Sequence, residues 1–78
     1  LPGYSEMRPV MEEEKLIFDA ACGDYQYPLG TPVLVGKRGT PEGVDYIYEV
    51  ENFGKRNTVF VTVGHEEGAK PEFTRVVR

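Results

Sequence analysis

Chemistry in this chain would have to come from very few side chains, and the single histidine is the first candidate. His65 stands in the sequence VGHEEG, next to two carboxylates. A histidine–carboxylate pair can act as general acid and base, but only with a nucleophile or a substrate held at hydrogen-bond distance in a shielded site. The sequence offers no such site, so we expect an exposed histidine in a turn.

The single cysteine is the second candidate, because Cys22 and His65 could form a thiol–imidazole pair. A nucleophilic cysteine needs a cation or a helix N-terminus to lower its pKa. Cys22 falls instead at the C-terminal end of the predicted helix, where the dipole disfavours a thiolate. We therefore expect a buried or half-buried structural thiol.

The sequence also lacks the spacing of a zinc site, since it has one histidine, one cysteine and scattered carboxylates. We predict no catalytic residue, no metal, no cofactor and no enzyme activity.

The stretch GKRGTPEG has the glycines and basic residues of a phosphate-binding loop, but not its ending. A P-loop closes with GK[ST] and opens a helix. Here Pro41 and Glu42 lead into a strand, which favours a hairpin turn in which Gly43 takes a positive φ. The basic pairs Lys37-Arg38 and Lys55-Arg56 are expected to be solvated loop charges, with a local partner contact as the alternative.

Length and charge limit the class of protein. Seventy-eight residues with 40 % hydrophobic content fit one domain with one core. A net charge of -4 repels polyphosphate, so we expect no nucleic-acid partner. No apolar run approaches the ~20 residues that span a bilayer, so no membrane partner is expected. A lone cysteine favours a reducing compartment, and we expect a cytoplasmic location.

The elements that would position these residues follow from the spacing of apolar side chains. Residues 10–22 show helical periodicity; Pro9 suits the helix start, and Gly23 is expected to end the helix with a positive φ. Alternation with a period of two then predicts strands in residues 32–78. A short run ends at Gly36, and the others cover 44–51, 58–63 and 73–77.

The predicted fold class is therefore α+β. One N-terminal helix packs on an antiparallel sheet of three to four strands, in a single domain spanning residues 1–78. Residues 1–9 are expected to form an extended N-terminal arm.

Two stretches of the sequence, one of them in this arm, resemble a known protein family. The leader LPGYSEMRP, followed by acidic residues and an amphipathic helix, resembles the start of the stefins, the disulfide-free members of the cystatin superfamily. The stretch EGVDYIYEVENFGKRNTVFVTV is similar to the stefin strand–hairpin–strand region. The resemblance implies a cystatin-like fold and reversible inhibition of papain-like cysteine proteases.

By this resemblance an N-terminal trunk and two turns form one wedge that fills the protease cleft. The trunk and the turns would contain the partner-binding residues Leu1, Pro2, Gly3, Tyr4, Thr40, Pro41, Glu42, Gly43, His65, Glu66 and Pro71. The first turn departs from the family pattern Gln-x-Val-x-Gly, since RGTPEG keeps only the last glycine, Gly43. All three segments must then meet at one end of the sheet.

Two other expectations accompany this hypothesis. The alternative function is a small SH3-like or other β-rich interaction module in a larger assembly. We expect a monomer, with a strand-swapped dimer as the alternative oligomeric state.

Overall fold

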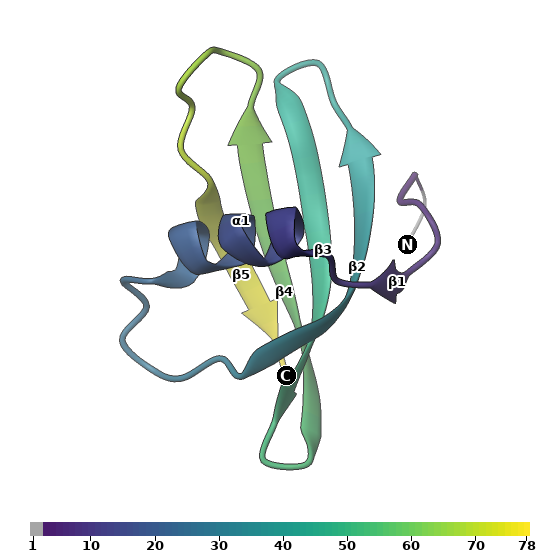
Figure 1. The fold of residues 1–78 in the computed structure, drawn as a ribbon, viewed down its shortest axis with the longest axis vertical. Helices are drawn as coiled ribbons and strands as arrows, with labels where there is room; N and C mark the ends of the chain where they lie inside the picture. The colour runs from purple at the N-terminus through teal and green to yellow at the C-terminus, as the bar shows by residue number, and fades with distance from the viewer. Residues whose placement is uncertain (1–2) are drawn as a thin grey trace.

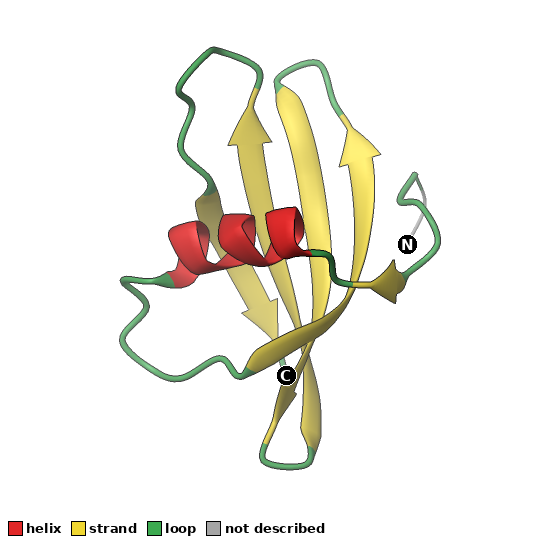
Figure 2. Cartoon of the chain, viewed as in Figure 1, coloured by secondary structure: helices red, strands yellow, loops and turns green. Residues whose placement is uncertain are grey.

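The computed structural model describes residues 3–78 and shows one helix lying across one face of an antiparallel sheet (Figures 1 and 2). The strands lie in the sheet in chain order. The elements are β1 (Arg8–Pro9), α1 (Glu12–Cys22), β2 (Thr31–Gly39), β3 (Gly43–Asn52), β4 (Lys55–Gly64) and β5 (Glu72–Val77). The predicted α+β class is confirmed, but the sheet has five strands rather than three to four. The extra strand, β1, comes from the arm, which pairs with β2 instead of standing free.

Helix α1 begins at Glu12, two residues later than predicted, because Met11 is still extended with φ of -96° and ψ of 166°. Met11 is consequently exposed rather than on the apolar face of the helix. The expectation for Gly23 was wrong, since its φ of -60° is right-handed. Its low helix propensity, rather than a left-handed cap, accounts for the end of α1. Within residues 3–78 no helix has the length and apolar character needed to cross a bilayer.

Strand β2 is much longer than the predicted short run, and Gly36 lies inside it instead of ending it. The alternation predicted for β3 is confirmed. Tyr46 and Tyr48 face the helix, while Ile47 between them faces the opposite side. Strand β4 also extends beyond the predicted bounds at both ends, because the β3–β4 hairpin pairs without a break from Gly43 to Asn52.

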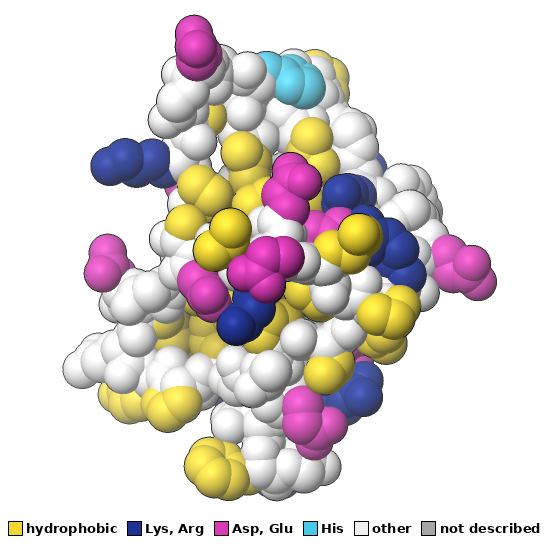
Figure 3. All heavy atoms as spheres, viewed as in Figure 1, with side chains coloured by type: hydrophobic (Ala, Val, Ile, Leu, Met, Phe, Trp, Pro, Cys, Tyr) yellow, Lys and Arg dark blue, Asp and Glu magenta, His cyan; other side chains and the backbone are white. Residues whose placement is uncertain are grey.

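The core lies between α1 and the inner face of the sheet. Phe18 is the one fully buried apolar residue of the helix, and its ring meets Tyr48 edge-on with the ring centroids 5.1 Å apart. The other buried members of this cluster are Leu29, Val35, Tyr46, Val50, Val59 and Val61. Acidic side chains are prominent on the solvent side of the helix (Figure 3). The fold thus has a packed inner face, and the arm covers part of the outer face at Ile47.

Candidate functional site

The loops that join β2 to β3 and β4 to β5 meet at one end of the sheet, the upper end in Figure 1. The backbone N–H of His65 donates to the carbonyl oxygen of Glu42 at 3.0 Å. The His65 ring atom Nε2 lies 3.1 Å from the carbonyl oxygen of Thr40. The histidine, cyan in Figure 3, therefore joins the first loop to the second. We call this end of the molecule, with its two loops and the neighbouring arm, the tip.

The first loop is a two-residue turn closed by hydrogen bonds between Thr40 and Gly43. Thr40 and Gly43 exchange backbone hydrogen bonds of 2.8 and 3.2 Å, and the Thr40 hydroxyl accepts a further bond from the Gly43 N–H at 3.0 Å. Pro41 and Glu42 are consequently exposed at the end of the turn. The expected positive φ of Gly43 was wrong. Glycine is required there because an added Cβ would lie 1.9 Å from the carbonyl oxygen of Val63.

The second loop exposes His65 and Glu66, whereas Pro71 is half-buried where the chain returns to the sheet. Gly68 has a φ of 80°, and the Ala69 N–H donates to the Glu66 carbonyl oxygen at 3.1 Å. These features define a compact turn. As predicted from the sequence, the histidine lies on an exposed turn.

The arm reaches the tip along β2. The Tyr4 ring lies against the Arg38 guanidinium at 4.4 Å, and a Cβ on Gly3 would lie 2.9 Å from Cδ of the same arginine. Arg38 is held in place by an ion pair of 2.8 Å with Asp45, and it precedes Thr40 by two residues. The structure therefore places Gly3 and Tyr4 beside the base of the first turn. Leu1 and Pro2, also predicted to bind the partner, lie outside the described residues.

The path of the arm depends on Gly36. A Cβ at this position would lie 2.9 Å from the carbonyl oxygen of Ser5 and 3.0 Å from the sulfur of Met7. The Ser5 N–H donates to the Lys37 carbonyl oxygen at 2.8 Å, and the Ser5 hydroxyl accepts from the Lys37 N–H at 3.0 Å. The arm is therefore ordered against the sheet before any partner arrives.

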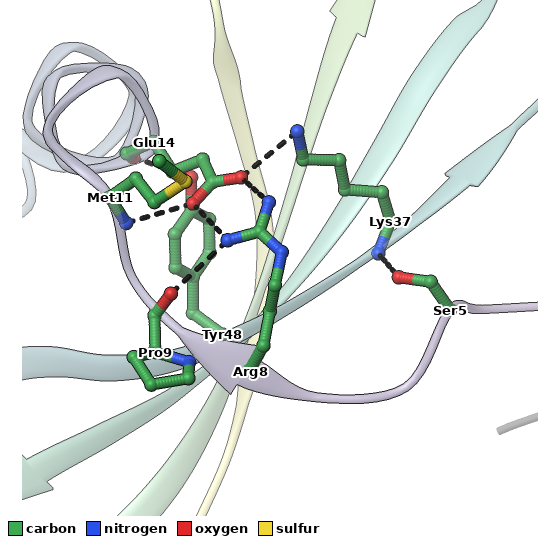
Figure 4. Close-up of polar contacts among 7 residues, drawn as sticks. All are labelled: Ser5, Arg8, Pro9, Met11, Glu14, Lys37 and Tyr48. Atoms are coloured by element: carbon green, nitrogen blue, oxygen red, sulfur yellow. Dashed lines mark hydrogen bonds and ion pairs between the residues drawn. The ribbon is translucent and has the colours of Figure 1, made fainter.

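A buried carboxylate fastens the arm to both the helix and the sheet (Figure 4). The side chain of Glu14 is only 3 % exposed and accepts two hydrogen bonds from the Arg8 guanidinium. It also accepts the Met11 N–H at 2.9 Å and forms an ion pair with Lys37 at 2.9 Å. The hydrogen bonds from Arg8 are the main reason that the pKa of the Glu14 carboxyl is lowered to about 2. Burial opposes this shift, whereas the Met11 N–H and Lys37 act in the same direction as Arg8. The Tyr48 hydroxyl donates to the Glu14 carbonyl oxygen at 2.7 Å.

This cluster is the part of the site that sequence reasoning missed. Lys37 and Arg38 were expected in a loop, but they lie in β2 and each forms an ion pair. Lys55 and Arg56 likewise begin β4, where Arg56 pairs with Glu51 at 3.1 Å. The adjacent glycines had suggested turns, although Gly36 serves close packing inside a strand.

The thiol is placed as predicted, half-buried at the end of α1 and packed against the core. Burial, with a smaller effect of Asp19, raises the Cys22 pKa to about 11. Among residues 3–78 no group of three or more histidine, cysteine or acidic side chains is arranged to hold a metal ion.

Together the fold and the tip define a small α+β protein in which an ordered arm and two linked turns form one surface. Comparison of the chain with models of protein families, with curated proteins and with solved structures finds no match.

Proposed function

We propose that this protein is a reversible inhibitor of papain-like cysteine proteases with a cystatin-like fold, and that the tip enters the active-site cleft. The observation that supports the proposal is that two turns are joined at one end of the sheet and that the arm packs beside the base of the first turn. His65 bonds to Thr40 and Glu42 of the first turn, and Tyr4 stacks on Arg38 beside that turn. These are the segments that the stefin resemblance assigns to binding.

The geometry suits a wedge that needs no catalytic group. Gly3 has no side chain, so the arm can pack closely against Arg38, whose Cδ would lie 2.9 Å from an added Cβ. The hydrogen bonds of the arm to Lys37 and of His65 to the first turn order these segments in the free protein. An ordered surface loses less conformational entropy on binding than a flexible one. Three such segments can together approach the ~800 Å² per partner of a standard interface.

The altered first turn bears on the strength of binding rather than on the shape of the wedge. In place of Gln-x-Val-x-Gly the turn offers Thr40, Pro41 and Glu42, with Gly43 packed against Val63. Pro41 is exposed and held by the Thr40–Gly43 hydrogen bonds, so it is the apolar group of this turn that faces a partner. Glu42 adds a negative charge, which favours a target whose cleft rim is basic.

The alternative function, an interaction module in a larger assembly, likewise requires no catalytic group. Its SH3-like version suits the chain less well, because such a barrel contains little helix and α1 has 11 residues packed on the sheet. Another β-rich interaction module remains the competing hypothesis.

Titration of papain with the purified chain tests the proposal. We expect reversible inhibition that competes with substrate. Deletion of residues 1–4 should weaken it at least about tenfold, because it removes a central contact. A matched control is Phe53→Asn at the opposite end of the sheet, which should inhibit as the parent does. Absence of inhibition at micromolar concentration would contradict the proposal, and an unchanged inhibition constant after the deletion would exclude the arm from binding.

A further inference from the structure

The end of the sheet opposite the tip carries an aromatic side chain that the proposed function does not use. The β3–β4 hairpin, lowest in Figure 1, closes with Phe53 and Gly54 at φ of 51° and 80°. Both positive values define a type I′ turn, for which asparagine and glycine are the favoured residues. Phe53 is the one non-glycine residue with positive φ among residues 3–78, and it is 93 % exposed.

A bulky residue in this conformation is strained and gains no burial within its own chain. Strained residues that persist without an internal contact are candidates for contact with another molecule. Lys55, two residues after Phe53, is exposed and has no ion pair within the described part of the chain. The hairpin end is thus an apolar knob with an unpaired positive charge beside it, and we call it the knob.

The outer face of the sheet, away from α1, contains an open groove of about 720 Å³. Its floor includes Ile47 and Phe60, which form a cross-strand pair. One wall is the arm, with Met7, and the other is β5, with Arg75 and Val77. The Arg75 guanidinium lies over the Phe60 ring at 4.2 Å. Ile47 is only 7 % exposed, so the surface that meets an incoming aromatic ring is mainly Phe60 with the Arg75 guanidinium stacked on it.

The charges on the rim complement those of the knob. Glu6, on the arm, lines the groove and has no ion pair within residues 3–78. Glu49, at the floor, has one ion pair within residues 3–78, with Arg56 at 3.9 Å, and also accepts a hydrogen bond from the Thr58 hydroxyl at 3.4 Å. The Glu6 carboxylate is therefore available to a cation such as Lys55, while Arg75 lies on the far wall beside the aromatic floor.

We propose that the groove is occupied by the knob of a second copy of this chain, with Phe53 against Ile47 and Phe60 and with Lys55 facing Glu6. The knob and the groove are different surfaces, so the contact is heterologous, and every added copy presents a free knob and a free groove. One hairpin end buries much less than a standard interface, so the association is weak and transient. The two turns of the tip stay exposed in such a chain of molecules, whereas Tyr4 of the arm lines the occupied groove. The contact does not depend on the inhibitor function.

Sedimentation velocity of the full chain over increasing concentration tests this contact with two variants. Phe53→Asn removes the knob and relieves the strained φ, and Val77→Glu places a carboxylate in the groove at a residue that is 45 % exposed. The parent should show concentration-dependent oligomers of increasing size. Each variant alone should associate at least about tenfold more weakly, as expected for loss of a central anchor.

An equimolar mixture of the two variants distinguishes this contact from other modes of association. Phe53→Asn keeps a groove and Val77→Glu keeps a knob, so the mixture should form a heterodimer and nothing larger. Circular dichroism confirms that both variants fold. The proposal is overturned if the parent stays monomeric up to millimolar concentration, if Phe53→Asn associates as the parent does, or if the mixture stays monomeric. A closed dimer that survives the Phe53→Asn change, as a strand-swapped dimer would, also overturns it.

Discussion

The Nζ atom of Lys37 lies 2.9 Å from a carboxylate oxygen of Glu14, and this ion pair joins β2 to the first turn of α1. The Arg8 guanidinium binds the same carboxylate from β1. One buried negative charge therefore holds together the strand that leads to the tip, the helix and the arm. The order of the arm at the tip depends on this carboxylate, which makes it the first residue to test.

Replacing Glu14 by glutamine should destabilise the fold by about 2 kcal/mol, because an amide cannot satisfy both cations and the Met11 N–H together. Both cations are about 40 % exposed and can be hydrated, which keeps the loss below that of a fully buried pair. Urea unfolding at neutral pH measures the change. The matched control is Glu13→Gln, an exposed neighbour in the same turn, which should change stability by less than about 0.5 kcal/mol. Equal effects of the two substitutions would contradict this role.

The same carboxylate predicts a pH dependence. Its pKa is lowered in the folded protein from 4.5 to about 2, so folding favours the ionised form. Its contribution to stability is complete above pH 4.5 and is lost as the pH falls toward 2, because the unfolded chain binds the proton first. The free energy of unfolding of the parent should therefore fall more steeply between these values than that of Glu14→Gln. Parallel curves would show that the carboxylate is not stabilised in the fold.

Replacing Gly36 by valine should lift the arm from the sheet, because even a Cβ meets Ser5 and Met7 at 2.9 and 3.0 Å. Hydrogen exchange of the Ser5 amide, which is bonded to the Lys37 carbonyl, should accelerate at least tenfold. Gly39→Val in the same strand is the control, since nothing lies within 4 Å of an added Cβ there. If exchange of the Ser5 amide were equally slow in Gly36→Val and Gly39→Val, the close approach of the arm to Gly36 would be disproved.

Phe53→Asn should raise the stability of the protein by about 1 kcal/mol, because asparagine tolerates the left-handed conformation and the lost phenyl ring is 93 % exposed. Phe53→Leu removes the aromatic ring but keeps the strain, so its melting temperature should stay near that of the parent. Thermal unfolding at low concentration, where the chain is monomeric, measures both. A drop in stability with asparagine would mean that the phenyl ring makes a contact within its own chain.

The Cys22 thiol should react very slowly with iodoacetamide. With a pKa raised to about 11, about one thousandth of the thiol is ionised at pH 8, and half-burial limits access further. Alkylation at pH 8 should therefore be much slower for the native protein than for the chain in denaturant. Equal rates would show an exposed, ordinary thiol.

The sequence predicted those parts of the fold that depend on local periodicity. The alternation through Tyr46 and Tyr48 and the apolar face containing Phe18 each needed only one segment to be recognised. The strand bounds were wrong where pairing partners decide them, as at Gly36, which local spacing identified as a strand end. Gly36 is needed because the arm, which is distant in sequence, packs closely against it. A local sequence pattern does not show such a contact.

In the candidate site, too, the features that depend on local sequence were predictable and those that depend on distant contacts were not. The positions of Thr40 and His65 in turns were predictable from glycine and proline spacing, and their contact follows from the pairing of β3 with β4. The Glu14 cluster was not predictable, because Arg8, Glu14 and Lys37 come from three elements and meet only in the folded chain. A type I′ turn containing phenylalanine is unusual, and Phe53 was for that reason not singled out from the sequence.

The central claim is that the arm and the two turns form one contact surface for a papain-like enzyme. Its most direct test is to record amide chemical shifts of the labelled chain during titration with papain whose catalytic cysteine has been carboxymethylated. We predict that the amides of Tyr4, Glu42 and His65 shift together with one binding constant, while that of Phe53 does not move. Shifts confined to the helix or to the outer face, or no shift at saturating enzyme, would contradict the claim.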